Sequence, residues 1–267
     1  MNILYIGDIM ARPGRKAIAK LLPKVLINHD IDFVIAQAEN VTHGKGIAKK
    51  HFYELEETGI NAFTGGNHSL EREDTREMIK NPLLPIVAPA NQVPKDYPKY
   101  KVIKTNNGKV AIVSLLGYTF PTGYADYVNN PLKEIDNILD SLKKEKLKAI
   151  IVNIHSDLSS EKVVIGHYLD GKVTAVVGDH WHVPTADARV LPKGTAHVTD
   201  VGMCGALNSS LGVSLEVAVK RWKTGEKLKN QLKESGELQF NAMLIEVDDK
   251  SIISKSIKRI QLFINSR

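Results

Sequence analysis

The chain has 267 residues, 43% of them hydrophobic and 25% charged, and a formal net charge of +6. This length is enough for a substantial buried core, and because no Gly/Ser-rich or Pro-rich linker divides the sequence, we expect one domain spanning residues 1–267. The single cysteine, Cys204, excludes an internal disulfide and an all-thiolate metal site.

Strand and helix patterns alternate in the first part of the chain, and strand pairs follow. The first strand is expected at Ile3–Ile6 and the first helix at Gly14–Asn28, with Ile18, Leu21 and Val25 on one face. Further strands are expected at Phe33–Ala36, Ala62–Thr64, Ile86–Ala88, Tyr100–Lys104, Val110–Leu115, Ala149–Ile154, Thr174–Val177, Ala196–Val198, Ala242–Val247 and Ile252–Arg259. Further helices are expected at Lys49–Thr58, Arg72–Lys80, Pro131–Lys144, Ser160–Tyr168 and Val213–Lys223. This order predicts a mixed α/β layered fold.

The start of the chain lacks the pattern of a targeting signal. Met1–Gly7 is a short apolar strand followed at once by Asp8, without the charged start and long apolar stretch of a signal peptide. No later run is long enough to span a bilayer. We therefore expect a soluble, cytoplasmic protein.

The positive charge suits an anionic substrate, but its distribution argues against a dedicated nucleic-acid-binding module. Basic residues cluster only at Lys143–Lys148 and Lys220–Lys233, which we interpret as solvated helix faces. Aromatic residues make up 6% of the chain and are not interleaved with basic ones, so there is little surface on which bases could stack.

Polar side chains of the metal-ligand type follow five of the expected strands. They are Asp8, Glu39, Asn40, Asn67, His68, His155, His180 and His182. Because the carboxyl ends of parallel strands share one edge of a sheet, these residues are expected to converge on one crevice. Carboxylate, carboxamide and imidazole ligands without thiolate suit Mn, Fe or Zn. On extended chain His180 and His182 point to the same side, which lets them hold two ions about 3.5–4 Å apart.

Each of these residues alone also has a structural explanation. A strand-end Asp8 is typical of a turn or helix cap, and Asn67 after two glycines is typical of a loop. His155 alone fits a buried structural histidine, and His180 with His182 fits a surface pair. The occurrence of the whole set at strand ends is what favours a metal site.

Several longer strings narrow this interpretation. They are GDIMARPGRKAIAKLLPK from Gly7, AENVTHGKGIAKKH from Ala38, GGNH ending at His68 and VGDHWHVPTADARVLPKGTAHVTDVGMCG from Val177. With His155, they resemble the YmdB-like bacterial family of metallophosphoesterases, within the calcineurin-like phosphoesterase superfamily. The similarity extends from Met1 to about Gly205 and is weaker from Phe240 onward.

The resemblance implies a four-layer α-β-β-α metallophosphoesterase sandwich with two divalent transition-metal ions, iron or manganese first and zinc next. It implies two ligand groups: Asp8, Glu39 and His182 with Asn40 for one ion, and Glu39, Asn67, His155 and His180 for the other. Glu39 then bridges both ions, since a carboxylate has two oxygens and a full charge. His68 is expected to stabilise the phosphoryl group and protonate the leaving oxygen.

Members of this family are associated with 2′,3′-cyclic nucleotide phosphodiesterase activity. The resemblance therefore implies a metal-dependent phosphodiesterase that uses a metal-bridging water, and it suggests a homo-oligomer. The alternatives are a metal-dependent phosphomonoesterase or nuclease, and a regulatory metal-binding protein with weak activity.

Two places in the sequence depart from the family pattern, and a third departs from the pattern of the wider superfamily. The sequence reads His155-Ser156-Asp157 where His-Ala-Glu is usual, and Gly205-Ala206 where Gly-Pro is usual. Met10 stands where many superfamily members have the histidine of Asp-x-His, and the YmdB-like pattern implies that Asn40 replaces it as a ligand.

Two further sets of residues are open to alternative interpretations. Arg15 at the start of the first helix either meets a phosphate or forms part of a solvent-facing basic turn. Tyr118, Phe120 and Tyr124 either stack on a base or pack within their loop.

Overall fold

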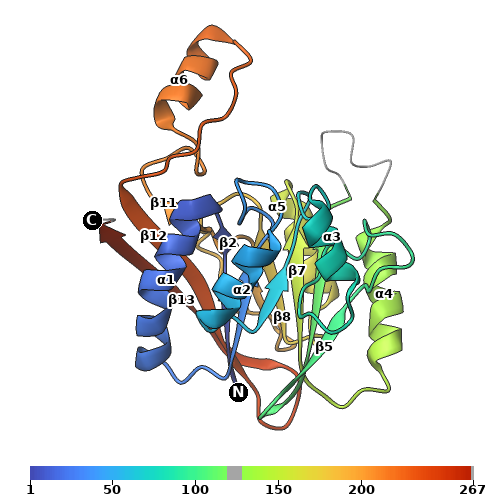
Figure 1. Ribbon diagram of the computed structural model, residues 1–267. Coiled ribbons are helices and arrows are strands. Elements are labelled where there is room, and N and C mark those ends of the chain that lie inside the picture. The colour runs from blue at the N-terminus through green and yellow to red at the C-terminus, as the bar shows by residue number, and fades with distance from the viewer. Residues whose placement is uncertain (119–127, 266–267) are drawn as a thin grey trace.

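The computed structural model describes residues 1–118 and 128–265 (Figure 1). Its strands are β1 (Asn2–Ile6), β2 (Asp8–Ile9), β3 (Phe33–Gln37), β4 (Ala62–Thr64), β5 (Lys101–Thr105), β6 (Gly108–Leu116), β7 (Leu147–His155), β8 (Ala175–Asp179), β9 (Arg189–Val190), β10 (Ala196–Val198), β11 (Met203–Ala206), β12 (Glu237–Val247) and β13 (Ser254–Asn265). Its helices are α1 (Ala11–Asn28), α2 (Lys49–Glu57), α3 (Glu73–Lys80), α4 (Pro131–Leu142), α5 (Ser159–Tyr168) and α6 (Leu215–Thr224).

The strands form two sheets, whose orders are β2-β11-β12-β1-β3-β4, with β13 paired to β12, and β5-β6-β7-β8-β10-β9. In the first sheet β1, β3 and β4 run parallel to one another. In the second sheet β6, β7, β8 and β10 are also parallel. On the side of β1 away from β3, the antiparallel strand β12 pairs with β1 and forms a long hairpin with β13, and β11 and β2 continue the sheet beyond β12.

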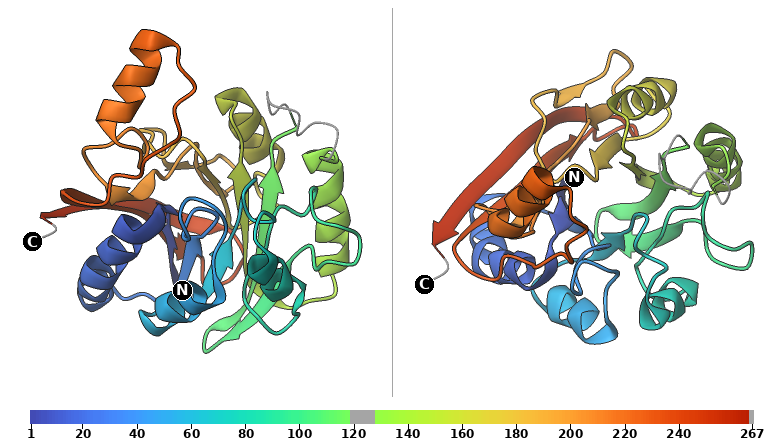
Figure 2. Two further views of the ribbon diagram at one scale, coloured as in Figure 1. Left: turned by 45° about the horizontal axis from the view of Figure 1, so that its top comes forward. Right: turned by 90° about the horizontal axis from the view of Figure 1, so that it is seen from above.

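Helices cover the outer faces of the two sheets, which pack against each other through their inner faces (Figure 2). Residues Ile3, Tyr5, Ile35, Ile112, Ile151, Val177 and Ile245 belong to the apolar layer between the sheets. Helices α1, α2 and α3 bury apolar residues against the first sheet, and α4 and α5 do so against the second. The predicted four-layer α-β-β-α sandwich is confirmed.

The apolar spacing of α1 explains its position. Ile18, Leu21, Leu22 and Val25 lie at helical spacing and are buried. The helix begins three residues before the predicted Gly14, because Pro13 lies in the first turn, where a missing backbone N–H costs nothing.

The strand predicted at Ile86–Ala88 does not form as a continuous ladder. The structure has isolated bridges there, Phe63 with Ile86 and Pro89 with Ser114. Flanking prolines explain the difference, since neither Pro85 nor Pro89 has an N–H for a ladder. Across residues 1–118 and 128–265, none of the helices combines the length and apolar character of a membrane span.

Candidate metal centre

The structure brings the predicted ligand residues together where several strands of both sheets end. Asp8 follows β1, whereas Glu39 and Asn40 follow β3. Asn67 and His68 follow β4, His155 ends β7, and His180 and His182 follow β8. Most of these side chains are buried, and Asp8 and His155 have no exposed surface.

One group of contacts joins Asp8, Asn40 and His182. Asn40 Nδ2 donates to Asp8 Oδ2 at 2.8 Å, and His182 Nε2 lies 2.9 Å from the same oxygen. Asn40 Nδ2 also lies 3.4 Å from His182 Nε2, so the amide occupies the position between the two side chains. The other oxygen of Asp8, Oδ1, is buried and has no hydrogen-bond partner among the described residues, which leaves it available to a cation.

A second group joins Glu39, Asn67, His155 and His180. His155 Nε2 lies 2.7 Å from Asn67 Oδ1 and 3.3 Å from Glu39 Oε1. One ligand atom from each of Glu39, His155 and His180 falls within 4.8 Å of the others. Glu39 also contacts the first group, because Asn40 Nδ2 donates to its Oε1 at 3.0 Å.

The histidines of this cluster do not supply enough positive charge to balance its buried carboxylates. Burial, followed by the charge of Asp8, raises the pKa of Glu39 well above its usual value. Burial lowers the pKa of His155 well below its usual value, and burial with the neighbouring His155 lowers the pKa of His180 to about 3. Divalent cations would supply the missing positive charge, and neutral imidazole nitrogens with carboxylate and amide oxygens fit Mn, Fe or Zn.

The pair Asp8 and His182 behaves differently. Burial raises the pKa of Asp8, but attraction by His182 outweighs it and leaves the pKa below its usual value. Burial lowers the pKa of His182, but attraction by Asp8 outweighs it and leaves the pKa above its usual value. The two side chains therefore stabilise each other's charge at 2.9 Å.

Two carboxylates that sequence reasoning missed hold the outer nitrogens of two histidines. Asp179 Oδ1 lies 2.6 Å from His155 Nδ1, and Asp157 Oδ1 lies 2.8 Å from His180 Nε2. Asp179 Oδ2 accepts from Asn153 Nδ2 at 2.5 Å. Such contacts fix ring orientation at metal sites. Their places in the sequence could have indicated them, since Asp179 directly precedes His180 and Asp157 lies two residues after His155.

His68 lies at the rim of the cluster. Its backbone N–H donates to Glu39 Oε2 at 3.0 Å, and its Nδ1 contacts the Glu71 carboxylate. The His68 side chain is 32% exposed, unlike the buried ligand candidates. Lys45 Nζ contacts the other oxygen of Glu71 at 2.7 Å. His68 therefore contacts the cluster through its backbone, while its partly exposed side chain lies beside Glu71.

The structure decides between some of the alternative interpretations given above for Arg15 and for the aromatic loop residues. Arg15 is not in a solvent-facing turn, since its side chain is 14% exposed and its Nη1 donates to the Val41 carbonyl at 2.7 Å. Tyr118 is exposed, and its backbone N–H donates to Glu161 Oε1 at 2.6 Å. Phe120 and Tyr124 lie outside the described residues.

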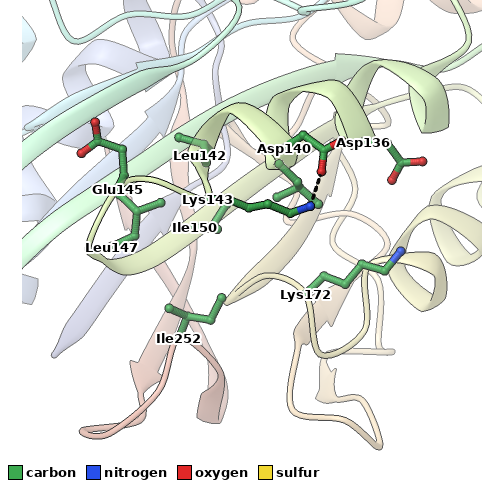
Figure 3. Close-up of a pocket in the computed structure, with 10 residues that line it drawn as sticks. Asp136, Asp140, Leu142, Lys143, Glu145, Leu147, Ile150, Lys172 and Ile252 are labelled. Carbon is green, nitrogen blue, oxygen red and sulfur yellow. Dashed lines mark ion pairs between the residues drawn. The ribbon is translucent and has the colours of Figure 1, made fainter.

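A cavity of about 610 Å³ lies away from this cluster, beside α4 and the start of β7 (Figure 3). Its wall combines apolar residues such as Leu139, Ile150 and Ile252 with charged residues such as Lys143 and Lys172. No candidate ligand lines it. The cluster of strand-end residues, rather than this cavity, carries the groups suited to metal chemistry.

Comparisons with known proteins show which proteins this chain resembles. The model of the family described as YmdB-like protein matches residues 4–260. A 2′,3′-cyclic-nucleotide 2′-phosphodiesterase of Bacillus subtilis is 35% identical over 97% of this chain and 96% of its own length. A putative phosphatase/phosphodiesterase of Mycoplasma genitalium is 32% identical over 99% of this chain and 94% of its own length.

Solved structures resemble the chain over nearly its whole length. A phosphatase of Mycoplasma pneumoniae has a TM-score of 0.89 at 31% identity and covers 98% of this chain and 93% of its own. A hypothetical protein of Thermus thermophilus has a TM-score of 0.87 at 31% identity and covers 98% of this chain and 99% of its own.

Proposed function

The chain belongs to the YmdB-like family, and from this premise we propose that it is a metal-dependent phosphodiesterase that hydrolyses 2′,3′-cyclic nucleotides. Phosphoesterase chemistry rests on the relatives, which are named as phosphodiesterases and phosphatases. The cyclic nucleotide rests on the Bacillus subtilis relative alone.

The observation that carries the proposal is the position of Glu39 between two groups of ligand-type side chains. Glu39 Oε1 contacts Asn40 of the first group at 3.0 Å and His155 of the second at 3.3 Å. Asp8 and His182 would hold one ion with Glu39, joined by Asn40 once its amide turns so that the oxygen, not Nδ2, faces the ion. Asn67, His155 and His180 would hold the other ion with Glu39. The bound ions would lower the pKa of a water molecule and polarise the phosphoryl oxygens. We expect iron or manganese in preference to zinc.

The remaining residues position these ligands and move a proton. Asp179 and Asp157 hold the outer nitrogens of His155 and His180, so the two rings keep fixed orientations toward the cluster. Glu71 contacts Nδ1 of His68, which directs the opposite ring nitrogen away from Glu71. We assign to that nitrogen the donation of a proton to the leaving oxygen.

Substrate profiling tests the proposal. With added Mn²⁺ or Fe²⁺, 2′,3′-cyclic AMP and bis-p-nitrophenyl phosphate should be hydrolysed faster than p-nitrophenyl phosphate. Glu39→Gln should abolish the activity, whereas Glu73→Gln, an exposed position on α3, should preserve it. Preference for p-nitrophenyl phosphate would indicate a phosphomonoesterase, and preference for RNA a nuclease. Metal binding without hydrolysis would indicate a regulatory protein.

We also infer that the chain self-associates through α6, which extends away from the two sheets in Figure 1 and in the left view of Figure 2. Leu215, Val219 and Trp222 lie at i, i+4 and i+7 on α6, and Trp222 is 88% exposed. Other helices of the described chain expose acidic side chains. Among these are Glu54 and Glu57 on α2, and Glu73 and Glu77 on α3. The basic residues of α6, Lys220, Arg221 and Lys223, complement that charge, so a second copy of this chain fits the stripe.

Light scattering coupled to size exclusion tests the self-association. We expect an oligomer that Val219→Glu converts to monomer and that high salt weakens. Ile27→Lys is the matched control, because Ile27 is 84% exposed on α1 and lies outside the stripe. A monomeric wild-type protein, or an oligomer unaffected by Val219→Glu, would rule out this surface.

A further inference from the structure

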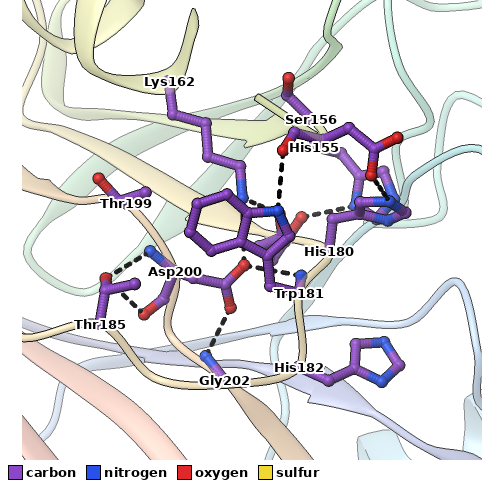
Figure 4. A network of polar contacts seen from close by, with 12 residues as sticks. His155, Ser156, Lys162, His180, Trp181, His182, Thr185, Thr199, Asp200 and Gly202 are labelled. Atoms are coloured by element: carbon purple, nitrogen blue, oxygen red, sulfur yellow. Dashed lines mark hydrogen bonds and ion pairs between the residues drawn. The ribbon is translucent and has the colours of Figure 1, made fainter. Parts of the chain in front are cut away.

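A fully buried ion pair lies directly beneath the segment that carries two of the candidate ligands. Lys162 on α5 and Asp200 have no exposed side-chain surface, and Lys162 Nζ lies 3.1 Å from Asp200 Oδ2 (Figure 4). Lys162 Nζ also lies 4.2 Å from the centre of the Trp181 ring. Burying two charges is costly unless both are paired and hydrogen-bonded, so the contacts of this pair show what it stabilises.

The segment His180–His182 has a backbone that needs external support. The φ angles of His180 and His182 are 106° and 62°, in a region that residues with a side chain rarely adopt. Such conformations persist where the surroundings hold them in place. The two histidines contact different groups of the cluster, since His182 contacts Asp8 and His180 lies beside His155.

The ion pair holds this segment on both sides of His180. Lys162 Nζ donates to the carbonyl of Asp179, directly before His180, at 2.6 Å. Asp200 Oδ2 accepts from the backbone N–H of Trp181, directly after His180, at 2.8 Å. The second oxygen of Asp200 accepts from the Gly202 N–H at 2.9 Å, which ties the pair to the strand region behind it.

We propose that Lys162 and Asp200 are positioning residues that impose the strained backbone of His180–His182 and thereby place both histidines for metal binding. This inference rests on the proposed metal-dependent function. Neither residue can touch a substrate, because both side chains are fully buried. The pair acts through the loop, and its loss should weaken the binding of both ions together.

The test compares Lys162→Met, Asp200→Asn and the double variant with wild type. Free Mn²⁺ is measured by electron paramagnetic resonance during titration, and hydrogen exchange of residues 179–183 is measured in the metal-free proteins. Each single variant leaves one buried charge unpaired and should be less stable than wild type. The double variant removes both charges and should regain stability, yet its Mn²⁺ affinity should stay about 10–100-fold weaker and its loop should exchange faster.

A structural ion pair elsewhere in the chain supplies the control. Lys99 Nζ lies 2.6 Å from the largely buried Glu134, so Lys99→Met should cost stability without changing Mn²⁺ affinity. If the folded double variant binds Mn²⁺ as wild type does and its loop exchanges at the wild-type rate, the inference is overturned. If wild type binds no Mn²⁺, the proposed function fails, and the exchange comparison alone decides whether the pair holds the loop.

Discussion

The carboxylate behind His155 sets the orientation of a ligand without facing the cluster itself. Asp179 Oδ1 lies 2.6 Å from His155 Nδ1 and keeps Nε2 on the side of Glu39 and Asn67. Asp179→Asn should therefore weaken Mn²⁺ affinity about 10–100-fold while leaving the fold intact. Titration with Mn²⁺ measures the loss, and Asp136→Asn, which removes a carboxylate that contacts Tyr168, is the control. Unchanged affinity in Asp179→Asn would contradict the orienting role.

The rim position of His68 predicts that metal binding and turnover separate there. His68→Ala should retain the metal content of wild type but lower turnover of a cyclic nucleotide on the order of 10² to 10⁴, the span for a lost general acid. A p-nitrophenyl ester has an acidic leaving group and should suffer a smaller loss. Equal losses on both substrates would indicate that His68 stabilises the phosphoryl group instead. Kinetics and metal analysis on the same preparation separate these results.

His51 makes the stability of the fold depend on pH outside the metal cluster. Burial, with the nearby charge of Arg15, lowers the pKa of His51 to about 4, and its Nδ1 lies 2.7 Å from Thr42 Oγ1. In the unfolded chain the pKa of a histidine is near 6.5, so below this pH the unfolded state binds a proton at His51 that the folded state does not. Stability present above pH 6.5 is therefore lost as the pH falls toward 4. As the pH falls from 6.5 toward 4, wild type should therefore lose more unfolding free energy than His51→Gln, which has no titrating side chain at this position. A difference that is constant from pH 7.5 to 5 would show that His51 does not titrate in this way.

At the scale of elements, α1 approaches β11 closely because Gly14 lacks a side chain. A Cβ at Gly14 would lie 2.6 Å from the Cys204 carbonyl oxygen, a backbone atom that cannot move aside. Overpacking costs about 1–3 kcal/mol, which exceeds the helix-propensity gain of up to ~1 kcal/mol from Gly to Ala. Gly14→Ala should lower the unfolding free energy by roughly 1–2 kcal/mol in chemical denaturation. Arg12→Ala, an exposed change in the same turn, should have little effect, and equal stability of both variants would contradict the packing argument.

The pattern of the sequence predicted the elements that have a clear apolar signal. It predicted β1 from a short continuous apolar run, buried at Ile3–Ile6, and α1 because its apolar residues recur at the spacing of a helix. It missed β2 and β11, since a ladder as short as Asp8–Ile9 with Met203–Cys204 has no period to detect.

The candidate ligands were predictable because each follows an expected strand, whereas the residues behind them were not. Lys162 and Asp200 lie 38 positions apart and meet only in the folded chain. On α5 the burial pattern even opposes hydropathy, since Lys162 is fully buried while Val164 is 56% exposed. No local rule predicts such a reversal, because the reason for it is a partner distant in sequence.

For the whole molecule, the single domain over residues 1–267 and the cytoplasmic location stay predictions. The two sheets share one apolar layer in which β1 and β3 of the first pack against β6, β7 and β8 of the second. A change at the ligand cluster, where both sheets contribute residues, should therefore affect the stability of both sheets together. Coincident denaturation curves from far-ultraviolet circular dichroism and tryptophan fluorescence would support a single cooperative unit.

Metal removal should destabilise the entire fold, because the cluster joins the ends of both sheets and contains buried carboxylates that lack sufficient countercharge. Burial raises the pKa of Glu39 well above its usual value and that of Asp179 to about 8, so bound cations would stabilise the charged carboxylates that burial disfavours. Mn²⁺ at 1,000 times its Kd should add about 4 kcal/mol, which corresponds to a rise in Tm of roughly 8–16 °C. Differential scanning calorimetry of chelator-treated and Mn²⁺-loaded protein measures the shift. Glu39→Gln should lose most of the rise, and an equal rise in that variant would show that Mn²⁺ stabilises the protein from another site.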